Sequence, residues 1–300
     1  MSTLVTRRRG ALWRGMGRYS TPYLFLAPFV IAFLVFLLFP IIYALLISFS
    51  HWKNGGPQWA GLFQYANIFS DSIFWQSLVN ALVILIIQVP VMLILAVIAA
   101  ALLNSPRLRF KSLFQLGFFL PILIDNVAYS LTFSFILANN GLLNQLLGMI
   151  GIAPIPWLNS MFWSKVAVMI AMTWHWTGYN VVILLGGLQN VPPEIYEAAR
   201  VDGAGPIRQW FSITIPMLRP LLVLEFILST IGTLQLFTEP YILTAGGPDN
   251  SSLTPVLYLY QVGFQQFHFG YASALAYILA VIIAIFSFVQ LRLTGGGAIA

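Results

Sequence analysis

Long apolar stretches alternate with polar segments along the whole 300-residue chain. A helix needs about 20 predominantly apolar residues to cross the hydrocarbon core of a bilayer. A membrane-spanning barrel would instead show segments of about 10 residues in strict alternation, which these Leu-, Ile- and Val-rich stretches lack. The pattern therefore predicts an all-α transmembrane protein with six spanning helices. The expected spans are residues 22–49, 75–103, 112–138, 165–188, 218–239 and 271–291.

These spans predict one transmembrane domain over residues 22–293, preceded by a basic N-terminal tail at 1–21 and followed by a short C-terminal tail at 294–300. The core of a signal peptide covers only about 7–15 residues. Because the first apolar run is longer, we interpret it as a membrane span. We expect no function of its own for the C-terminal tail.

The composition agrees with a membrane protein and excludes several other classes. Hydrophobic residues make up 59% of the chain and charged residues 7%, with a mean hydropathy of +0.87, whereas about a quarter of the residues of a soluble domain are charged. The net charge of +6 does not indicate nucleic-acid binding, because the basic residues sit at the ends of apolar runs, next to lipid headgroups. Cysteine is absent from the sequence, which excludes disulfides, thiolate chemistry and cysteine-ligated metals.

Lysine and arginine are shared unevenly between the two sides of the membrane. Of the 14 basic residues, all but Lys53 and Lys165 fall on the side of the N-terminus when successive loops are assigned to alternate sides. Cytoplasmic loops carry an excess of Lys and Arg. We therefore expect a multi-pass protein of the cell inner membrane with both termini in the cytoplasm, and the loop at 189–217 is then cytoplasmic.

The sequence offers no catalytic constellation. In a P-loop the Lys follows Gly directly, whereas Lys53, Lys111 and Lys165 follow Trp, Phe and Ser. There is no His-Glu-x-x-His motif, and the three histidines are too scattered along the chain to suggest a metal site. We expect a chain that is not an enzyme and binds no metal or cofactor itself.

The cytoplasmic loop contains a short segment with the features of a sharply bounded helix. Pro192 and Pro193 pre-set the first helical turn, acidic residues favour the positive helix N-terminus, and Gly203 supplies a left-handed stop. One interpretation is an amphipathic connector on the membrane surface. The other is a docking helix, because its face of small apolar side chains suits close packing in a partner's groove.

The spacing of this loop also carries a family resemblance. Glu197-Ala198-Ala199 is followed after three residues by Gly203, and after nine more residues by Ile213, Ile215 and Pro216. This pattern resembles the EAA loop of ABC-importer permeases, with Ile215 in place of the usual Leu. The resemblance implies that the loop docks on an ATPase subunit and couples it to transport. The coupling residues implied are Glu194, Glu197, Ala198, Ala199, Asp202 and Gly203.

Further motifs are similar to those of carbohydrate-uptake permeases, in the branch of the maltose-system F and glycerol-phosphate A subunits. The resemblance implies a heterodimer with a second permease, two ATP-binding-cassette ATPase subunits that bind ATP and Mg, and an extracytoplasmic solute-binding protein. The motifs are Trp59-Ala60-Gly61-Leu62, Asn140-Gly141-Leu142-Leu143-Asn144, Leu243-Thr244-Ala245-Gly246-Gly247-Pro248 and Gly270-Tyr271-Ala272-Ser273-Ala274.

A polar and aromatic patch occupies the fourth span at residues 173–180. Aromatic faces suit the C–H surfaces of sugars, and hydroxyl and amide groups suit their O–H groups. Trp176 and Tyr179 share a helix face, whereas Trp174 is offset from Trp176 by about 200° and lies on the opposite side. In the family the sugar site lies on the spans before and after the EAA loop. The substrate-path residues implied are Trp176, Tyr179, Asn180, Ser229, Thr233 and Gln235.

Three titratable residues leave alternatives open. Asp125 and Glu225 fall within or near spans, where a carboxylate normally faces a cavity or a partner; each either lines the path or hydrogen-bonds within the bundle. Together with His175 they would suit a proton or sodium relay, so an ion-coupled secondary transporter is the main alternative function. A permease for another solute is a further alternative, although a phosphate ligand would favour a buried Arg or Lys and none lies mid-span.

Overall fold

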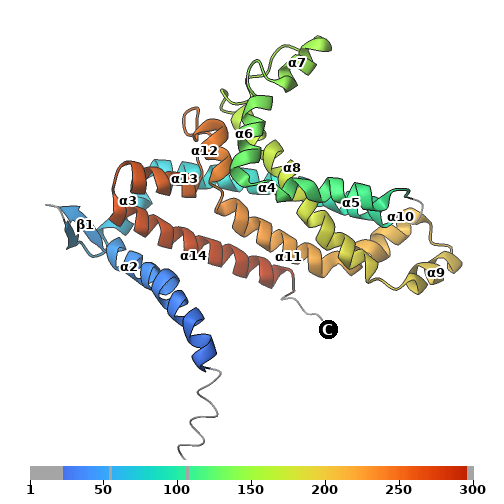
Figure 1. Cartoon of the computed structure of the whole chain (residues 1–300), viewed down its shortest axis with the longest axis horizontal. Helices are drawn as coiled ribbons and strands as arrows, with labels where there is room; N and C mark the ends of the chain where they lie inside the picture. Colours follow the sequence, from blue (N-terminus) through green and yellow to red (C-terminus); the bar gives the residue numbers. More distant parts are fainter. Residues whose placement is uncertain (1–22, 54–55, 106–107, 296–300) are drawn as a thin grey trace, which may run out of the picture.

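The computed structural model describes residues 23–53, 56–105 and 108–295. The basic tail expected at 1–21 lies outside the described residues, as do residues 296–300 of the C-terminal tail. In the described part, five helices are long and apolar enough to cross a membrane. They are Tyr23–Ser48, Ser72–Asn104 (α4), Trp163–Gln189 (α8), Pro206–Leu234 and Phe269–Leu293 (α14) (Figure 1).

The fifth span differs from its expected range at both ends. It begins in the loop expected at 189–217 with α10 (Pro206–Gln209), passes through a π-helical turn and continues as α11 (Ile215–Leu234). The expected end at residue 239 is wrong. Pro240 has no N–H to pair with the carbonyl of Leu236 in a continuing helix, and this carbonyl instead accepts a hydrogen bond from the Thr254 hydroxyl at 2.6 Å.

The third expected span, residues 112–138, is a sharply bent pair of helices. α5 (Lys111–Phe119) and a 3-10 turn at Leu120–Leu123 meet α6 (Asn126–Ile136) at an angle of 98°. Pro121 lies in the turn, where it removes one backbone donor and favours a break. The sequence predicted one span here, and the structure has a broken one. Figure 1 shows α6 leaving the direction of α4 and α5.

Asp125 caps the second half of this bent pair. Its carboxylate accepts the backbone N–H of Val127 at 2.8 Å, which satisfies one of the free donors at the start of α6. The side chain is exposed and does not line the cavity described below. Of the two roles left open for Asp125, the structure therefore shows hydrogen bonding within the helices.

The core forms where α4, α8 and α11 pack together. Ala96 and Ala100 of α4 meet Val181 and Leu184 of α8, and Leu218 of α11 completes this cluster. Small side chains at the contact let membrane helices approach closely. α14 packs against the outer side of α11.

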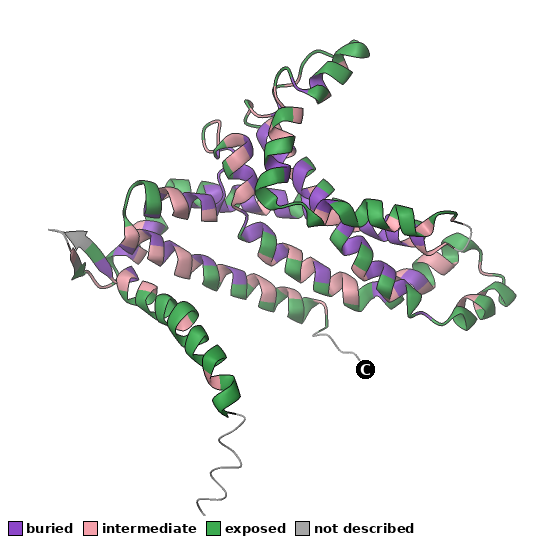
Figure 2. Cartoon of the chain, in the orientation of Figure 1, coloured by how far each residue is buried: buried purple, intermediate pink, exposed green. Residues whose placement is uncertain are grey.

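The first span stands apart from this core. The whole apolar window of Tyr23–Ser48 is unburied. The last part of this span is α2 (Phe39–Ser48), and Figure 2 shows the helix running away from the bundle toward its N-terminal end. It is held at α14, where the Tyr277 hydroxyl donates to the carbonyl of Ile41 at 2.6 Å. An apolar surface of this extent is stable against lipid or another subunit and not against water.

The other loops between the spans contain structure that the apolar pattern did not predict. β1 (Ser50–Lys53) and β2 (Gly56–Trp59) form an antiparallel hairpin with Ser50 opposite Trp59. Short helices follow in the loops. They are α3 (Phe63–Ser70), α7 (Leu142–Met149), α12 (Thr238–Thr244), α13 (Pro255–Tyr260) and a π-helical turn at Gln261–Gln265.

Asp71 fastens these loops to the bundle. It caps α4 through the amides of Ile73 and Phe74, and it accepts hydrogen bonds from the hydroxyls of Tyr258 at 2.6 Å and Tyr271 at 2.5 Å. Partial burial raises the pKa of Asp71, but these hydroxyl and amide donors together bring the pKa below its ordinary value. The loops are therefore attached to the bundle by hydrogen bonds to a carboxylate that stays ionised at neutral pH.

Contact between α5 and α8 depends on Gly178, since a Cβ at this position would lie 1.7 Å from the carbonyl oxygen of Phe118. We expect Gly178→Ala to lower the thermal melting temperature of the purified protein, because overpacking costs about 1–3 kcal/mol. Gly186→Ala, in the same helix but with open space around it, is the matched control and should be neutral or slightly stabilising. Equal melting temperatures for the two variants would contradict this packing.

Candidate functional site

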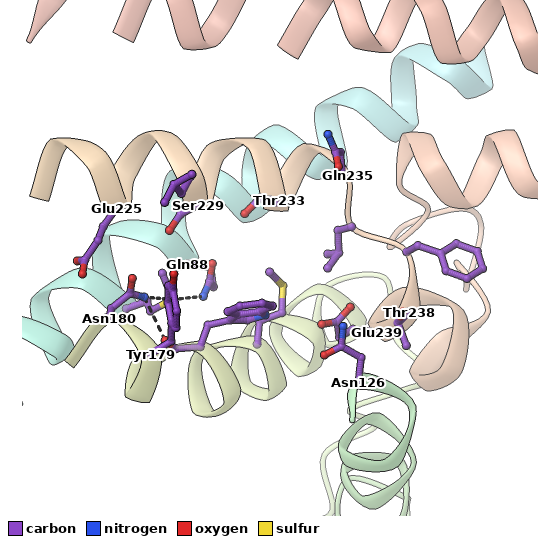
Figure 3. A pocket seen from close by; sticks show the side chains of 17 residues that line it. Gln88, Asn126, Tyr179, Asn180, Glu225, Ser229, Thr233, Gln235, Thr238 and Glu239 are labelled. Atoms are coloured by element: carbon purple, nitrogen blue, oxygen red, sulfur yellow. Dashed lines mark hydrogen bonds between the residues drawn. The ribbon is translucent and has the colours of Figure 1, made fainter. Parts of the chain in front are cut away.

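A cavity of about 230 Å³ lies between α8 and α11 and is closed by α4, the start of α6 and α12. The regular faces of α8 and α11 contribute side chains one turn apart, while the connection after α11 contributes consecutive residues. The lining residues are Gln88, Met92, Asn126, Met172, Trp176, Tyr179, Asn180, Glu225, Leu228, Ser229, Gly232, Thr233, Gln235, Leu236, Phe237, Thr238 and Glu239 (Figure 3).

All six side chains implied as a substrate path line this one cavity. Trp176 and Tyr179 face it from α8, and Trp174 does not. Trp174 is instead 43% exposed and lines an apolar groove on the α4 and α5 side. The helical phase predicted from the spacing therefore agrees with the geometry, and the role of these residues in transport remains a prediction.

The aromatic part of the cavity is organised by edge contacts. The rings of Trp176 and Tyr179 meet edge to face with centroids 6.2 Å apart. Tyr179 is 39% exposed, so its ring and hydroxyl are open to the cavity. Leu228 and Phe237 add apolar surface. These groups provide flat and apolar contact area for a ligand with C–H faces.

Amide side chains supply the polar part. Asn180 donates to the Trp176 carbonyl at 3.1 Å and contacts the Met92 sulfur at 3.4 Å. The amide nitrogen of Gln88 faces the same sulfur at 3.4 Å and the Thr173 hydroxyl at 3.5 Å. The carbonyl oxygen of the Gln88 side chain is buried and has no hydrogen-bond partner among the described residues. The two amide side chains at the cavity wall are therefore oriented by contacts within the protein.

Two carboxylates lie at the cavity wall. Glu225 of α11 is 1% exposed, and neither of its oxygens has a partner in the described part of the chain. Glu239, in the first turn of α12, is 3% exposed and accepts a hydrogen bond from the Tyr129 hydroxyl. Of the two roles left open for Glu225, the structure shows that it lines the cavity.

The sequence reasoning missed the residues that α4, α6 and α12 contribute. Gln88 is a polar residue within an otherwise apolar run and carried a usable signal. Asn126 and Glu239 reach the cavity only because the helices break next to them. Neither break was predicted, so their positions could not be either.

His175 is not part of the cavity. Its ring is buried and stacks on that of Tyr129 with centroids 4.0 Å apart. Within the described residues, no hydrogen bond or ion pair joins His175 to Asp125 or Glu225. His175 and Asp125 are near enough to interact through their charges, whereas Glu225 belongs to the cavity wall.

The short helix expected in the loop at 189–217 is α9 (Pro193–Val201), and it lies at the opposite end of the molecule from the hairpin (Figure 1). Gly203 has φ +77, and its following residue Ala204 donates to the Ala199 carbonyl at 2.8 Å, which closes the helix end. The helix protrudes. Its expected coupling residues are exposed except for the half-buried Ala199.

α9 is joined to the start of the fifth span by side chains. The hydroxyls of Tyr196 and Thr214 lie 3.1 Å apart, and the Gln209 amide donates to the Ala204 carbonyl at 2.7 Å. An exposed ion pair between Glu197 and Arg200, at 3.7 Å, lies along the helix. The helix is therefore accessible on its outer face and attached on its inner one.

Spanning helices around a polar cavity, with an attached and exposed helix at one end, define a membrane-transport permease. The chain belongs to the family of binding-protein-dependent transport system inner membrane components, whose family model matches residues 6–294.

Individual relatives agree with this family. The lactose transport system permease protein LacF of Rhizobium radiobacter is 41% identical over 273 residues, which cover 89% of this chain and 92% of LacF. The arabinooligosaccharides transport system permease protein AraP of Bacillus subtilis (strain 168) is 35% identical over 291 residues, which cover 94% of this chain and 92% of AraP. The permease expected from the EAA spacing is thus confirmed, and the comparisons do not support the ion-coupled alternative.

The fold is also that of a solved importer. A chain in the crystal structure of a bacterial ABC transporter involved in the import of the acidic polysaccharide alginate superposes with a TM-score of 0.84. The match covers 95% of this chain and 98% of that one at 22% sequence identity. The fold of this chain therefore occurs in an ABC importer.

Proposed function

We propose that this chain forms the membrane path for a sugar or a related polar solute in an ATP-binding-cassette importer. The observation that carries the substrate class is the cavity, where Trp176 and Tyr179 lie with the amide of Asn180 and the hydroxyl of Ser229. Aromatic faces suit the C–H surfaces of sugars, and the polar groups suit their hydroxyls. The names of the lactose and arabinooligosaccharide relatives support the same class.

The importer is proposed to contain three other kinds of subunit. An extracytoplasmic binding protein delivers the solute, a second permease forms a heterodimer with this chain, and two ATPase subunits bind ATP and Mg. This chain itself is non-catalytic. The family's dependence on a binding protein and the unburied first span support this assembly, with membrane lipid covering the remaining apolar surface.

α9 is proposed to dock on an ATPase subunit through Glu194, Glu197, Ala198, Ala199, Asp202 and Gly203. Its exposure supports this role, as does its attachment to the helix that carries Glu225, Ser229 and Thr233. Movement of the docked helix would then be passed along α11 to the cavity. Coupling of this kind requires one element with two arrangements that both sites bias.

Replacement of Tyr179 by Ala is expected to reduce solute uptake in a complex that still assembles. The variant loses a stacking surface and a hydroxyl, together about 1.5–2.5 kcal/mol, which corresponds to roughly twelve- to sixtyfold in affinity. Trp174→Ala is the control from the other face of α8. The two variants are compared by uptake of radiolabelled sugar into proteoliposomes. If Trp174→Ala loses uptake and Tyr179→Ala does not, the substrate path lies on the other face of α8.

Replacement of Gly203 by Val is expected to uncouple ATP hydrolysis from transport. A β-branched residue at φ +77 costs about 1–2 kcal/mol and displaces the end of α9. Glu197→Lys should act in the same direction by reversing a charge on the docking surface. Gly205→Val is the matched control, since Gly205 is extended and has open space. If complexes with Gly203→Val and Glu197→Lys take up solute and hydrolyse ATP normally, the loop only connects two spans and does not couple the ATPase to transport.

Single cysteines at Arg14 and Arg107 are expected to resist an impermeant thiol reagent in intact cells, because both positions are proposed to be cytoplasmic. The natural chain has no cysteine, so each label has one target. A cysteine at Asn140, in a loop proposed to be extracytoplasmic, should react and serves as the positive control. Labelling of Arg14→Cys from outside would overturn the orientation.

A further inference from the structure

The short helix α7 has an apolar face that the described part of the chain leaves open. Leu142, Leu146 and Met149 are spaced four and three residues apart, which places them on one face of the helix. Their side chains are 56%, 49% and 80% exposed. Such a face requires an apolar partner, because a helix that meets water on one side carries polar residues there.

The opposite face of α7 is already used for packing within the chain. Leu143 and Leu147 pack against a buried cluster that includes Trp157. Between them lies the buried Asn144, whose amide nitrogen donates to the Ile155 carbonyl and whose amide oxygen accepts the indole N–H of Trp157, each at 3.0 Å. The loop is therefore ordered by its own contacts, and the exposed face is left for a partner outside the chain.

The absence of charge in this region favours lipid over a soluble protein as that partner. Between Asp125 and Lys165 the sequence contains no Asp, Glu, Lys, Arg or His. A surface that receives a soluble protein has a polar rim, and complementary charges steer the encounter. The loops before the second span and before the last one do carry ionisable residues, among them Asp71 and Asp249. The partner of the α7 face is thus recognised without charge.

The apolar face of α7 also continues into the membrane-spanning part of the chain. Val127, Leu131 and Phe135 are exposed and lie four residues apart along α6, which is half of the broken third span. After α7, Phe162 is exposed directly before α8. In Figure 1, α7 stands to the side of the long helices α4, α11 and α14 and not beyond their ends. The lipid around the spans is therefore the apolar medium next to this face.

We propose that α7 is an interfacial helix that inserts Leu142, Leu146 and Met149 into the lipid on the side of the membrane opposite α9. The two helices belong to successive connections between spans, which places them on opposite sides. Interfacial helices bury an apolar face about 5–10 Å into the boundary between headgroups and acyl chains. In α7 the second side rests on the protein instead of facing water.

This anchor reaches the cavity through the packing beneath α7. The cluster on which α7 rests contains Tyr129 of α6 and Leu243 of α12. Tyr129 also donates a hydrogen bond to the cavity residue Glu239. Two of the helices that close the cavity are thus held to the membrane surface by the same contacts.

Nitroxide labels on single cysteines test the position of α7, because the natural chain has no cysteine. Leu146→Cys and Met149→Cys are labelled in an otherwise cysteine-free complex in vesicles of phosphatidylethanolamine and phosphatidylglycerol. Power-saturation EPR compares collisions with oxygen, which concentrates among lipid chains, and with a nickel chelate, which stays in water. The ratio of oxygen to nickel accessibility should be several-fold higher at both positions than at Gln58→Cys, an exposed position in β2.

A pair of double variants separates apolar contact from side-chain volume. With the label at Leu142→Cys, the combination of Leu146→Asn and Met149→Asn should lower the ratio of oxygen to nickel accessibility several-fold, because α7 then loses its attraction to lipid. The combination of Leu146→Met and Met149→Leu keeps the apolar composition and should leave the ratio unchanged.

Three results would overturn the inference, and none of them depends on solute uptake. If the labels at Leu146→Cys and Met149→Cys give the same ratio as Gln58→Cys, the face meets water. If both reagents collide with them only rarely, the face lies against another subunit. If addition of the binding protein lowers the accessibility of these labels to either reagent, the face is a docking surface for that protein.

Discussion

Inside a membrane a backbone polar group has no water to pair with, and this constraint governs every place where the chain stops being helical. At the end of α11 the free carbonyl of Leu236 is taken by the Thr254 hydroxyl, and at the bend of the third span Asp125 takes the amide of Val127. These two breaks bring Asn126 and Glu239 to the cavity wall. The cavity is therefore formed where helices are interrupted, and its shape depends on the side chains that satisfy the interruptions.

The sequence predicted the parts that depend on local periodicity. Apolar length identified the spans, and the 100° helical step correctly separated Trp174 from Trp176 and Tyr179. It could not predict the 98° bend, because Pro occurs both in kinked spans and in broken ones. Nor could it place Gln88, since its approach to the cavity depends on how α4 packs against α8. The missing information was in each case a tertiary contact.

One continuous span connects the two proposed sites. The helix from Pro206 to Leu234 starts next to α9, where Thr214 contacts Tyr196, and ends at the cavity. Its π-helical turn at Trp210–Thr214 lies near the attachment of α9, and such turns occur often at functional sites. In the proposed mechanism, displacement of α9 by an ATPase is therefore transmitted by a helix that itself carries cavity residues, with no intermediate loop in which the movement would be lost.

The two cavity carboxylates differ in what they do for the fold. Glu239 stands in the first turn of α12, where negative charge is stabilised by the helix N-terminus, and it is paired with Tyr129. Glu225 lies in the regular part of α11, where backbone groups pair within the helix and need no side chain. The fold thus accounts for the burial of Glu239 and gives no structural reason for that of Glu225.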